Sequence, residues 1–477
     1  MDVIENENLG TKVLVVNSRN DIHCWRFSFE AFCTARDQGL DVSFIDLSHL
    51  DPSWTIFMHA KYALRKILRV PHYSSDISKI IKDSSNTLLK TTRFNSQSIS
   101  NFFISLNDVY LRTMPRIEEE MNVATHSWVS SQVGNTKYEW NARSKFQCFR
   151  AIQSQRNTRA VISRLLSKNS FETILTFNGR FPVDSTVVKV CKEYFIKYYL
   201  FDGGSLSGNN FNRIQYFSQS PHSINELKEK IDSYWENSQD ETRLSIAKSS
   251  LDAIVLGKRA LGSDFNWNTS TEKANSNYDW SKTIVFFASS DWELGAINEW
   301  LPKNGFTSQF LAAEALHKVC RQRGLDLVIK LHPIRKNYRG RRSEKSEALA
   351  WKNFRDREGV HIVGHEVPVN PIFLASRALM SAGFRTSVTA QTMYLGFPTV
   401  IMGDVPWRDD QKNFNFATNE LQLDGFIEKH VAGNLPRVEL NPIFKWAYYH
   451  AVCGKKMLYS KFTPGSKRLI LLGSFKY

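Results

Sequence analysis

The chain has 477 residues and a formal net charge of +15 at pH 7, with hydrophobic residues at 42% and charged residues at 23%. These ordinary globular proportions exclude a mainly disordered or fibrous protein. The sequence shows neither the roughly 18–20 apolar residues of a membrane-spanning helix nor the basic start and apolar stretch of a secretory signal. Its six cysteines form no CxxC pair, so we expect neither a zinc site nor a disulfide framework. We therefore predict a soluble cytoplasmic protein with reduced cysteines.

The excess of basic residues favours polyanionic partners: nucleic acid, an anionic membrane face or phosphorylated small molecules. The sequence carries no helix-turn-helix, zinc-finger or RNA-binding signature, so nucleic acid is not expected. Peripheral contact with the anionic inner face of the plasma membrane stays open. The alternative is a basic surface that is merely solvated.

The first part of the chain alternates short β-branched runs with helical patterns. Predicted strands lie at 12–17, 41–45, 172–177 and 197–201, and predicted helices at 25–38, 114–131, 144–166 and 185–194. A strand, a helix and a second strand at this spacing form a right-handed parallel crossover, which begins a doubly wound sheet.

The same alternation starts again after 266–282, a stretch rich in Asn, Ser and Thr that predicts a linker. Predicted strands follow at 283–287, 325–331, 360–363, 378–380 and 399–402, and predicted helices at 308–323, 370–376 and 386–395. Two such units predict an α/β fold with two Rossmann-like domains and a cleft between the carboxyl ends of their sheets. We expect domains at 1–265 and 283–435, and a helical segment at 436–477 that crosses back to the first domain.

Several motifs resemble a known family. They are ETILTFNGRF at 172–181, KYYLFDGG at 197–204, FFASSDWELGAINEW at 286–300, VIKLHPIR at 328–335 and GVHIVGHEVPVNPIFLASRALMSAGFRTSVTAQTMYLGFPTVIMG at 359–403. These motifs look like capsular-polysaccharide-type glycosyltransferases, whose two Rossmann-like domains form the architecture called GT-B. The similarity is strongest at 283–403.

The resemblance implies that a sugar moves from a nucleotide-activated donor to a surface polysaccharide of capsule or O-antigen type, or to a lipid-linked glycan. The first domain would bind the acceptor and the second the donor nucleotide. No cofactor is implied besides the donor, and no metal is expected because the sequence has no convincing DxD pair at a strand end. The pair at 409–410 lies in a predicted loop.

Donor contacts are expected at the ends of two predicted strands. Lys330, His332 and Arg335 follow one of them, where cationic groups would stabilise the negative charge on the leaving nucleotide phosphate. In the resembling proteins the His-Pro pair contacts the donor phosphate, so we place His332 in the catalytic set; the alternative is a histidine bonded to a loop carbonyl. Ser289 and Ser290 follow the other strand and suit close approach to a phosphate, although a helix-capping loop explains them as well.

A second expected donor contact is the loop at 381–387, which joins a predicted strand to a helix. Backbone amides at the helix start, with Arg385 and the hydroxyls of Thr386 and Ser387, would bind an anion. The resembling proteins carry a glutamate one turn later that holds the donor ribose, and Gln391 stands at that position here. The alternative is that Ser and Thr merely cap the helix.

An inverting transfer, which we favour, needs a general base for the acceptor hydroxyl. Asp202 ends a predicted strand and is our candidate, although the resembling proteins more often have Glu there. Asp21 and His23 are rivals after the first strand and otherwise acceptor contacts, and Asn178 and Arg180 would hold acceptor or donor oxygens. Any of these residues could instead cap a helix or close a turn, and a retaining mechanism stays open.

Two other functions stay open. One is a polyol-phosphate transferase that uses a CDP-polyol donor and similar phosphate-binding loops. The other is a non-catalytic sibling that binds a glycan or a partner enzyme, which the departures at Asp202 and Gln391 would fit.

Overall fold

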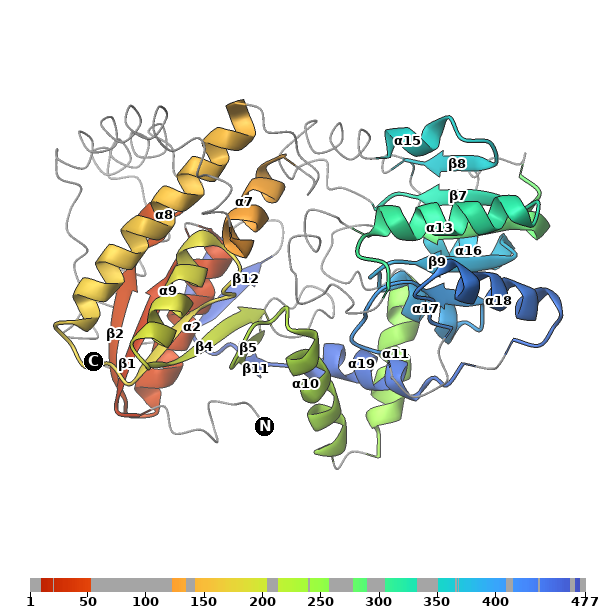
Figure 1. Cartoon of the computed structure of the whole chain (residues 1–477). Coiled ribbons are helices and arrows are strands. Elements are labelled where there is room, and N and C mark those ends of the chain that lie inside the picture. The colour runs from red at the N-terminus through yellow and green to blue at the C-terminus, as the bar shows by residue number, and fades with distance from the viewer. Residues whose placement is uncertain are drawn as a thin grey trace.

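The computed structural model describes most of the secondary structure of the chain. The described residues are 10–19, 21–52, 122–133, 142–203, 213–238, 241–256, 278–289, 305–332, 351–364, 367, 369–408, 415–435, 438–463 and 468–471. Figure 1 shows two α/β lobes side by side, each built on its own sheet. This arrangement confirms the predicted α/β class with two Rossmann-like units.

The sheet of the first lobe has six strands in the order β11-β5-β4-β3-β1-β2. Its strands are β1 (Lys12–Asn17), β2 (Asp41–Asp46), β3 (Thr173–Phe177), β4 (Lys197–Gly203), β5 (Arg213–Phe217) and β11 (Lys455–Lys456). The four strands β2, β1, β3 and β4 are parallel, whereas β5 and β11 are antiparallel to their neighbours. The parallel strands therefore end at one edge, and the strand order reverses between β1 and β3, where such sheets bind ligands.

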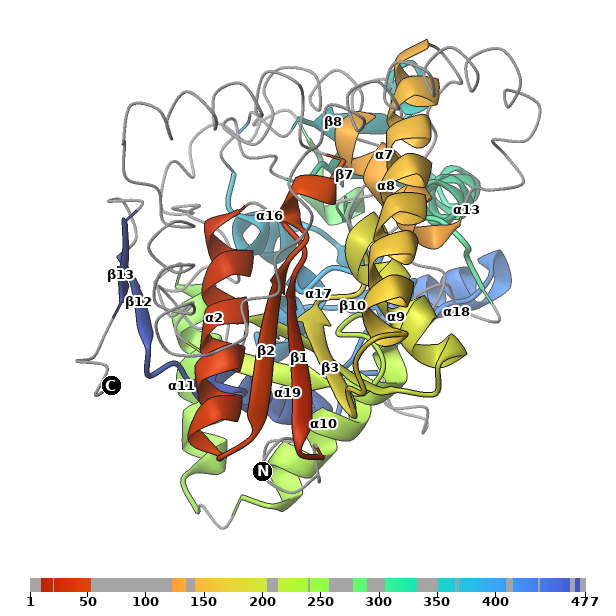
Figure 2. The ribbon, with the colours of Figure 1, turned by 90° about the vertical axis from the view of Figure 1, so that its left-hand side faces the viewer.

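Both faces of the first sheet are covered by helices, which explains why its strands are nearly continuous apolar runs. The helices described in this part of the chain are α2 (Ile22–Asp37), α7 (Val123–Val133), α8 (Ala142–Leu166), α9 (Pro182–Glu193), α10 (Ile224–Glu236) and α11 (Arg243–Val255), with a 3-10 turn at Ser48–Leu50. Val13 and Val15 pack with α2, and the alternate residues Leu14 and Val16 pack with α8 and α9. In Figure 2, α2 accordingly lies on one side of β1 and β2, and α8 and α9 lie on the other.

The sheet of the second lobe has five parallel strands in the order β10-β9-β6-β7-β8. They are β6 (Thr283–Phe287), β7 (Asp326–Lys330), β8 (Val360–Val363), β9 (Met380–Gly383) and β10 (Thr399–Ile401). The order along the sheet is that of a Rossmann half, and the direction of winding reverses between β6 and β9. A ligand of this lobe is therefore expected outside the carboxyl ends of those two strands.

Helices cover both faces of the second sheet as well. The helices described in this part of the chain are α13 (Gln309–Gln322), α15 (Lys352–Arg355), α16 (Pro371–Arg377), α17 (Val388–Tyr394), α18 (Glu420–Val431) and α19 (Asn441–Val452), with a 3-10 turn at Trp280–Lys282. Ile284 and Phe286 pack with α13 and α18, and Val285 and Phe287 pack with α16. Among the described residues, no helix is both long and apolar enough to span a membrane.

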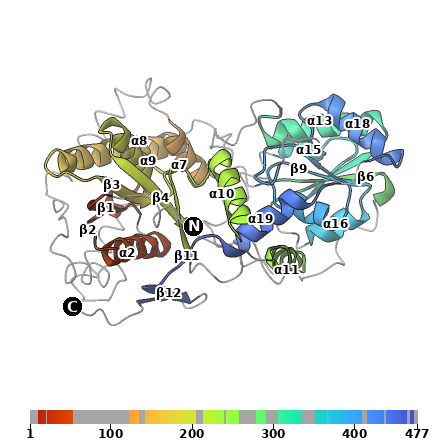
Figure 3. The ribbon, with the colours of Figure 1, turned by 90° about the horizontal axis from the view of Figure 1, so that it is seen from below.

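The C-terminal part of the chain returns from the second lobe to the first. Helix α19 packs against α10 and α11 between the lobes, as Figure 3 shows from below, and the Trp446 ring lies 4.8 Å from Trp407. Strand β11 then joins β5, and Arg213 Nη1 donates to the Val452 and Gly454 carbonyls at 2.6 and 2.8 Å. A hairpin of β12 (Ser460–Thr463) and β13 (Arg468–Leu471) follows, so this segment contains strands besides the helix expected there.

Candidate active site

The carboxyl end of β3 turns sharply at Asn178 and Gly179. Both residues have left-handed backbone angles, with φ of 47° and 74°. Asparagine and glycine adopt this conformation more readily than other residue types. A Cβ on Gly179 would lie 2.7 Å from Leu200 Cδ1, so the turn packs directly on β4. Asn178 is thereby held beside the end of that strand.

A chain of hydrogen bonds joins three side chains at this edge of the first sheet. Asn178 Nδ2 donates to Asp202 Oδ2 at 2.5 Å, and His222 Nε2 lies 3.0 Å from Asn178 Oδ1. The other carboxylate oxygen of Asp202 accepts the Gly203 N–H at 2.7 Å. Because Asn178 presents its oxygen to the imidazole, His222 must carry its proton on Nε2 and act as the donor. The structure thus brings the predicted residues Asn178 and Asp202 into contact.

The electrostatic environment of Asp202 suits a base. Burial raises the pKa of Asp202 to about 6, even though hydrogen bonds from the Gly203 amide and the Asn178 side chain lower it; the nearby charge of Asp21 raises it further. A carboxylate with a pKa near the working pH combines a large ionised fraction with real proton affinity.

His222 was not predicted from the sequence, and its environment keeps it neutral. Burial and the positive charge of Arg180 lower the pKa of His222 to about 3. The ring therefore donates to Asn178 across the neutral pH range without changing its own charge. His222 orients Asn178, which in turn orients Asp202.

The loop that carries His222 is fixed by a buried carboxylate. Glu226 accepts the backbone N–H groups of residues 218–220 at 2.6–3.2 Å. Ser223 is the N-cap of α10 and accepts the Glu226 N–H at 3.4 Å. The Ser-x-x-Glu spacing is the sequence signature of a helix start, so the sequence does contain the signal that places His222 just before α10.

Asp21 and His23, the rivals to Asp202, lie at the start of α2. Asp21 Oδ1 accepts the N–H groups of His23 and Cys24 at 3.0 and 2.9 Å, which is helix capping. Its other oxygen lies 3.7 Å from Arg19 Nε, which also pairs with the buried Asp51 at 3.4 Å. The contacts of Asp21 are therefore those of a helix cap. Its negative charge raises the pKa of Asp202 without direct contact.

A second buried acid, Asp184, lies on the first turn of α9 and was not predicted as a functional residue. Both of its carboxylate oxygens are buried. Burial raises the pKa of Asp184 well above its usual range, and a hydrogen bond with the Ser18 side chain and the charge of Arg19 lower it only in part. Burial therefore favours the protonated form of Asp184, on the helix that follows β3. No group of three or more His, Cys, Asp or Glu side chains in the described ranges is arranged to hold a metal ion.

In the second lobe, the reversal of strand order places two predicted segments side by side. Phe287 at the end of β6 is paired with Gly383 at the end of β9. Ser289 follows β6 directly; it is buried, and its N–H donates to Gln309 Oε1 at 3.0 Å. Ser289 thus lies at the expected ligand position, with its backbone amide held by α13.

The loop after β9 is shorter than predicted, because the strand continues through Gly383 and only residues 384–387 connect it to α17. A Cβ on Gly383 would lie 2.6 Å from Thr389 Cγ2 and 2.7 Å from Thr386 Cγ2, so only glycine fits. Arg385 has a left-handed φ of 52° and is buried, with its guanidinium carbon 5.1 Å from the ring of Phe384. A cation is thereby fixed at the carboxyl end of β9.

The hydroxyl residues after Arg385 differ in their contacts. Thr386 Oγ1 accepts the Val388 N–H at 3.4 Å, which agrees with a capping role. Ser387 makes no capping bond with its side chain. Gln391 is buried one turn later on α17. The Thr386 hydroxyl therefore caps the start of α17, whereas the Ser387 hydroxyl does not.

Lys330 and His332 lie at the end of β7, as the sequence predicts. The buried Lys330 donates from Nζ to the carbonyl oxygens of Gly364 and Val367 at 2.9 and 3.3 Å, so its ammonium holds the loop that follows β8. His332 is half-buried and lies two residues beyond the strand. Two predicted donor residues lie outside the described residues: Ser290 and Arg335.

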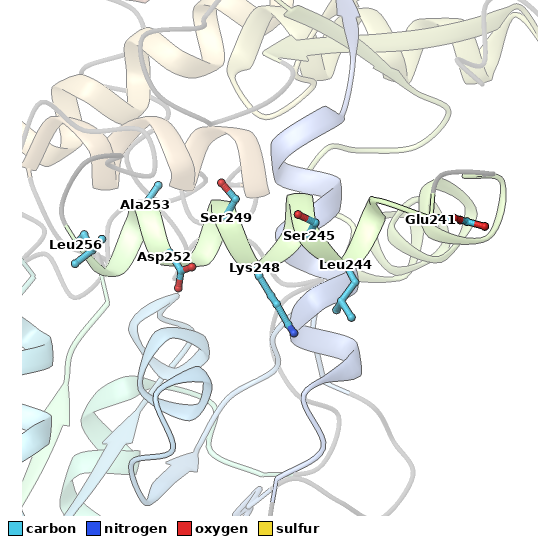
Figure 4. Close-up of a pocket in the computed structure, with 8 residues that line it drawn as sticks. All are labelled: Glu241, Leu244, Ser245, Lys248, Ser249, Asp252, Ala253 and Leu256. Carbon is cyan, nitrogen blue, oxygen red and sulfur yellow. The ribbon is translucent and has the colours of Figure 1, made fainter.

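An open surface depression runs along α11 and is separate from these strand ends (Figure 4). It is lined by Glu241, Leu244, Ser245, Lys248, Ser249, Asp252, Ala253 and Leu256. All of these residues belong to α11 or directly flank it, and none follows a strand. We assign the depression no part in the site.

Comparison with known proteins gives structural likeness only. No family model matches the sequence, and no curated protein matches it. Among solved structures, the beta Kdo 2,4 transferase of KpsC from Thermosulfurimonas dismutans is similar with a TM-score of 0.38 and 11% identity, covering 58% of this chain and 79% of that chain. The beta Kdo 2,7 transferase of KpsC from the same organism has a TM-score of 0.35 and 10% identity, covering 66% and 86%.

A UDP-GlcNAc 2-epimerase from Methanocaldococcus jannaschii, solved with UDP-GlcNAc and UDP, is also similar. Its TM-score is 0.29 and its identity 11%, covering 91% of this chain and 98% of that chain. TM-scores below 0.5 say nothing about activity, so the chemistry has to be inferred from the residues themselves.

Proposed function

We propose that the protein is a glycosyltransferase that moves a sugar from a nucleotide-activated donor to a glycan acceptor of the surface-polysaccharide type. The observation that carries this proposal is the chain Asp202–Asn178–His222 at the carboxyl edge of the first sheet. In it, a carboxylate with a pKa of about 6 is bonded to Asn178, which is bonded in turn to His222, and the protein also contains a second sheet of Rossmann order.

Asp202 is the proposed general base. As the acceptor hydroxyl oxygen attacks the anomeric carbon of the donor, its proton passes to an oxygen of Asp202. The bond from the anomeric carbon to the phosphate oxygen breaks, and the electron pair leaves with the nucleotide phosphate. Attack from the face opposite the leaving group inverts the anomeric centre. Holding the base in one orientation favours this step because little reorganisation remains.

The second lobe is the proposed donor site. The nucleotide phosphate would lie at the reversal of strand order between β6 and β9, near Ser289, Arg385 and Ser387. The guanidinium of Arg385 and neighbouring N–H and O–H donors would stabilise the negative charge that grows on the leaving phosphate. His332, at the end of β7, would add a donor from the adjacent strand.

Thermal unfolding with CMP, CDP, UDP, GDP and dTDP tests the donor site. A nucleotide at about 100 times its dissociation constant adds roughly 2.7 kcal/mol to the free energy of unfolding. We expect one nucleotide to raise the melting temperature of the wild type and to have a much smaller effect on Arg385→Ala and His332→Ala. Stabilisation by CDP together with release of CMP from a CDP-polyol would indicate the polyol-phosphate reaction instead. A folded protein that no nucleotide stabilises at millimolar concentration would contradict the proposal.

A further inference from the structure

The turn between α9 and β4 exposes two aromatic side chains. Phe195 is 96% exposed and Tyr194 is 45% exposed. Phe195 also has a left-handed φ of 55°, a conformation that favours glycine or asparagine over a bulky side chain. Neither burial in this chain nor backbone preference explains a phenylalanine at this position. Its apolar surface is therefore available to something outside the chain.

Basic side chains surround this turn. Lys192, on the last turn of α9, and Lys197, the first residue of β4, are both exposed. Lys197 is paired with Thr173, the first residue of β3, so the exposed Lys168 just before β3 belongs to the same edge of the sheet. We call these three lysines, together with Tyr194 and Phe195, the amino-edge tip.

Helix α8, which ends just before Lys168, is also basic. Helix α8 carries six Lys or Arg residues and no Asp or Glu. The acids Glu193 and Glu172 also flank the tip in the sequence. Glu193 pairs with Arg159 at 2.8 Å, and Glu172 accepts the N–H and hydroxyl of Thr11 at 3.0 Å. Glu193 and Arg159 cancel each other and Glu172 keeps its negative charge, so the three lysines leave the tip with a net positive charge.

We propose that the amino-edge tip docks the protein on an anionic membrane surface, with Phe195 inserted at the level of the lipid headgroups. Lysines near an anionic bilayer are attracted to it, and their long aliphatic stems let the ammonium groups stay in water. An aromatic side chain beside them adds apolar area that the interface can bury. A turn with one almost fully exposed ring and lysines around it suits a bilayer interface, which offers anionic headgroups and apolar material side by side.

This placement sets the distance between the membrane and the candidate base. Lys197 and Asp202 lie at opposite ends of β4, so the five residue steps between them separate tip and base by about 17 Å at ~3.3 Å per step. If the proposed glycosyl transfer is right, the acceptor hydroxyl reacts well above the bilayer, as at the growing end of a glycan that is several sugars long. The docking itself does not depend on the transfer reaction.

Vesicle co-sedimentation tests the docking with the full chain. The probes are phosphatidylcholine vesicles with and without phosphatidylglycerol, at low and at physiological ionic strength. We expect binding only to the anionic vesicles, and weaker binding at the higher ionic strength. The double variant Lys168→Glu/Lys192→Glu should bind at least tenfold more weakly. The matched double variant Lys352→Glu/Lys429→Glu changes the same charge at exposed positions of the second lobe and should bind like the wild type.

A second pair of variants separates insertion of the ring from attraction of charge. Phe195→Asn suits the left-handed backbone, so it should fold as well as the wild type while its binding falls several-fold. Leu421→Asn removes another apolar side chain that is 82% exposed, on α18, and should leave binding unchanged. Because nucleotide stabilisation is a separate measurement, a loss of docking and a failure of the donor site cannot be mistaken for each other.

Three results would overturn the proposal. One is equal binding of the wild type to neutral and anionic vesicles. Another is an equal loss in the matched second-lobe double variant, which would mean that overall charge alone decides. The third is a tip that binds single-stranded nucleic acid in preference to vesicles, or that associates with a second copy of the chain.

Discussion

The carboxyl edges of the two sheets carry different chemistry. At the edge of the first sheet, Asp184 and Asp202 are acids whose pKa burial raises, and His222 is a histidine that burial keeps neutral. At the edge of the second sheet, the buried groups are the cations Lys330 and Arg385, with hydroxyl side chains beside them. A group that accepts a proton and a group that holds an anion need opposite environments. In the proposed reaction, the two lobes would therefore divide the requirements of a transfer between them.

The largest effect is expected where the first edge loses its base. Asp202→Asn keeps the size of the side chain and removes its proton affinity, so glycosyl transfer should fall roughly 10²–10⁴-fold, the usual contribution of general base catalysis. Nucleotide stabilisation should persist, because the proposed donor site lies on the other lobe. The measurement is the initial rate with the donor whose nucleotide raises the melting temperature. An unchanged rate would mean that Asp202 is not the base, and that the first lobe does not supply the proton acceptor in the way proposed.

The same substitution should change how stability depends on pH. The pKa of Asp202 rises from 3.8 to about 6 in the folded protein. The folded state therefore holds this proton more tightly than the unfolded state, and stability from this group is present below pH 3.8 and lost as the pH rises through about 6. Above that pH, Asp202→Asn should be more stable than the wild type by up to about 3 kcal/mol.

Chemical denaturation at pH 4 and pH 8 measures this difference. The two proteins should be close at pH 4 and diverge at pH 8. Asp41→Asn, at the exposed start of β2, serves as the control and should follow the wild type at both pH values. A difference that is the same at both pH values would mean that the carboxylate of Asp202 is not desolvated.

At the carboxyl edge of the second sheet, the expected effect comes from close packing around Gly383 and not from a change of protonation. A Cβ at Gly383 would meet the methyl groups of Thr386 and Thr389 at less than 3 Å. Gly383→Ala should therefore lower the free energy of unfolding by about 1–3 kcal/mol and weaken nucleotide stabilisation, since overpacking displaces its neighbours. Gly425→Ala, on α18 with open space around it, should instead stabilise by about 0.5–1 kcal/mol because alanine favours the helix.

Much of the fold could be predicted because buried parallel strands are continuous apolar runs that stand out from their surroundings. The strands at 12–17, 41–46 and 283–287 lie within one residue of where the sequence predicts them. The sequence predicts no helix or strand from β5 to α11. Strand β5 is hard to recognise because Arg213–Phe217 is a short mixture of apolar and polar residues. Its structure depends on antiparallel pairing with β4, which local pattern does not reveal.

Some residues of the candidate site could likewise be predicted from the sequence and others could not. Asn178 and Asp202 could be predicted, since both follow apolar runs and strands in one parallel sheet end together. His222 could not, because it reaches Asn178 only through a loop beyond an antiparallel strand. Asp184 escaped notice because an acid after Pro182 at a helix start normally faces solvent, and only the packed structure shows that it is buried.

The smallest expected effects on stability and nucleotide binding are those of replacing two serines, one in each lobe. Ser223 caps α10 with its hydroxyl, so Ser223→Ala should cost about 1 kcal/mol of stability. Ser387 precedes α17 without a capping bond, so Ser387→Ala should change stability by less than about 0.5 kcal/mol. If Ser387 instead serves the donor phosphate, the same variant should weaken nucleotide binding roughly 3–10-fold, as the loss of one hydrogen bond does.

Urea denaturation and nucleotide titration of both serine variants give the answer. A stability loss in Ser387→Ala equal to that in Ser223→Ala, with nucleotide binding intact, would make both serines simple caps. The second edge would then owe its anion affinity to Arg385 and the backbone alone. A binding loss without a stability loss would show that the hydroxyl is kept free of the helix for the donor, as the division between the two edges requires.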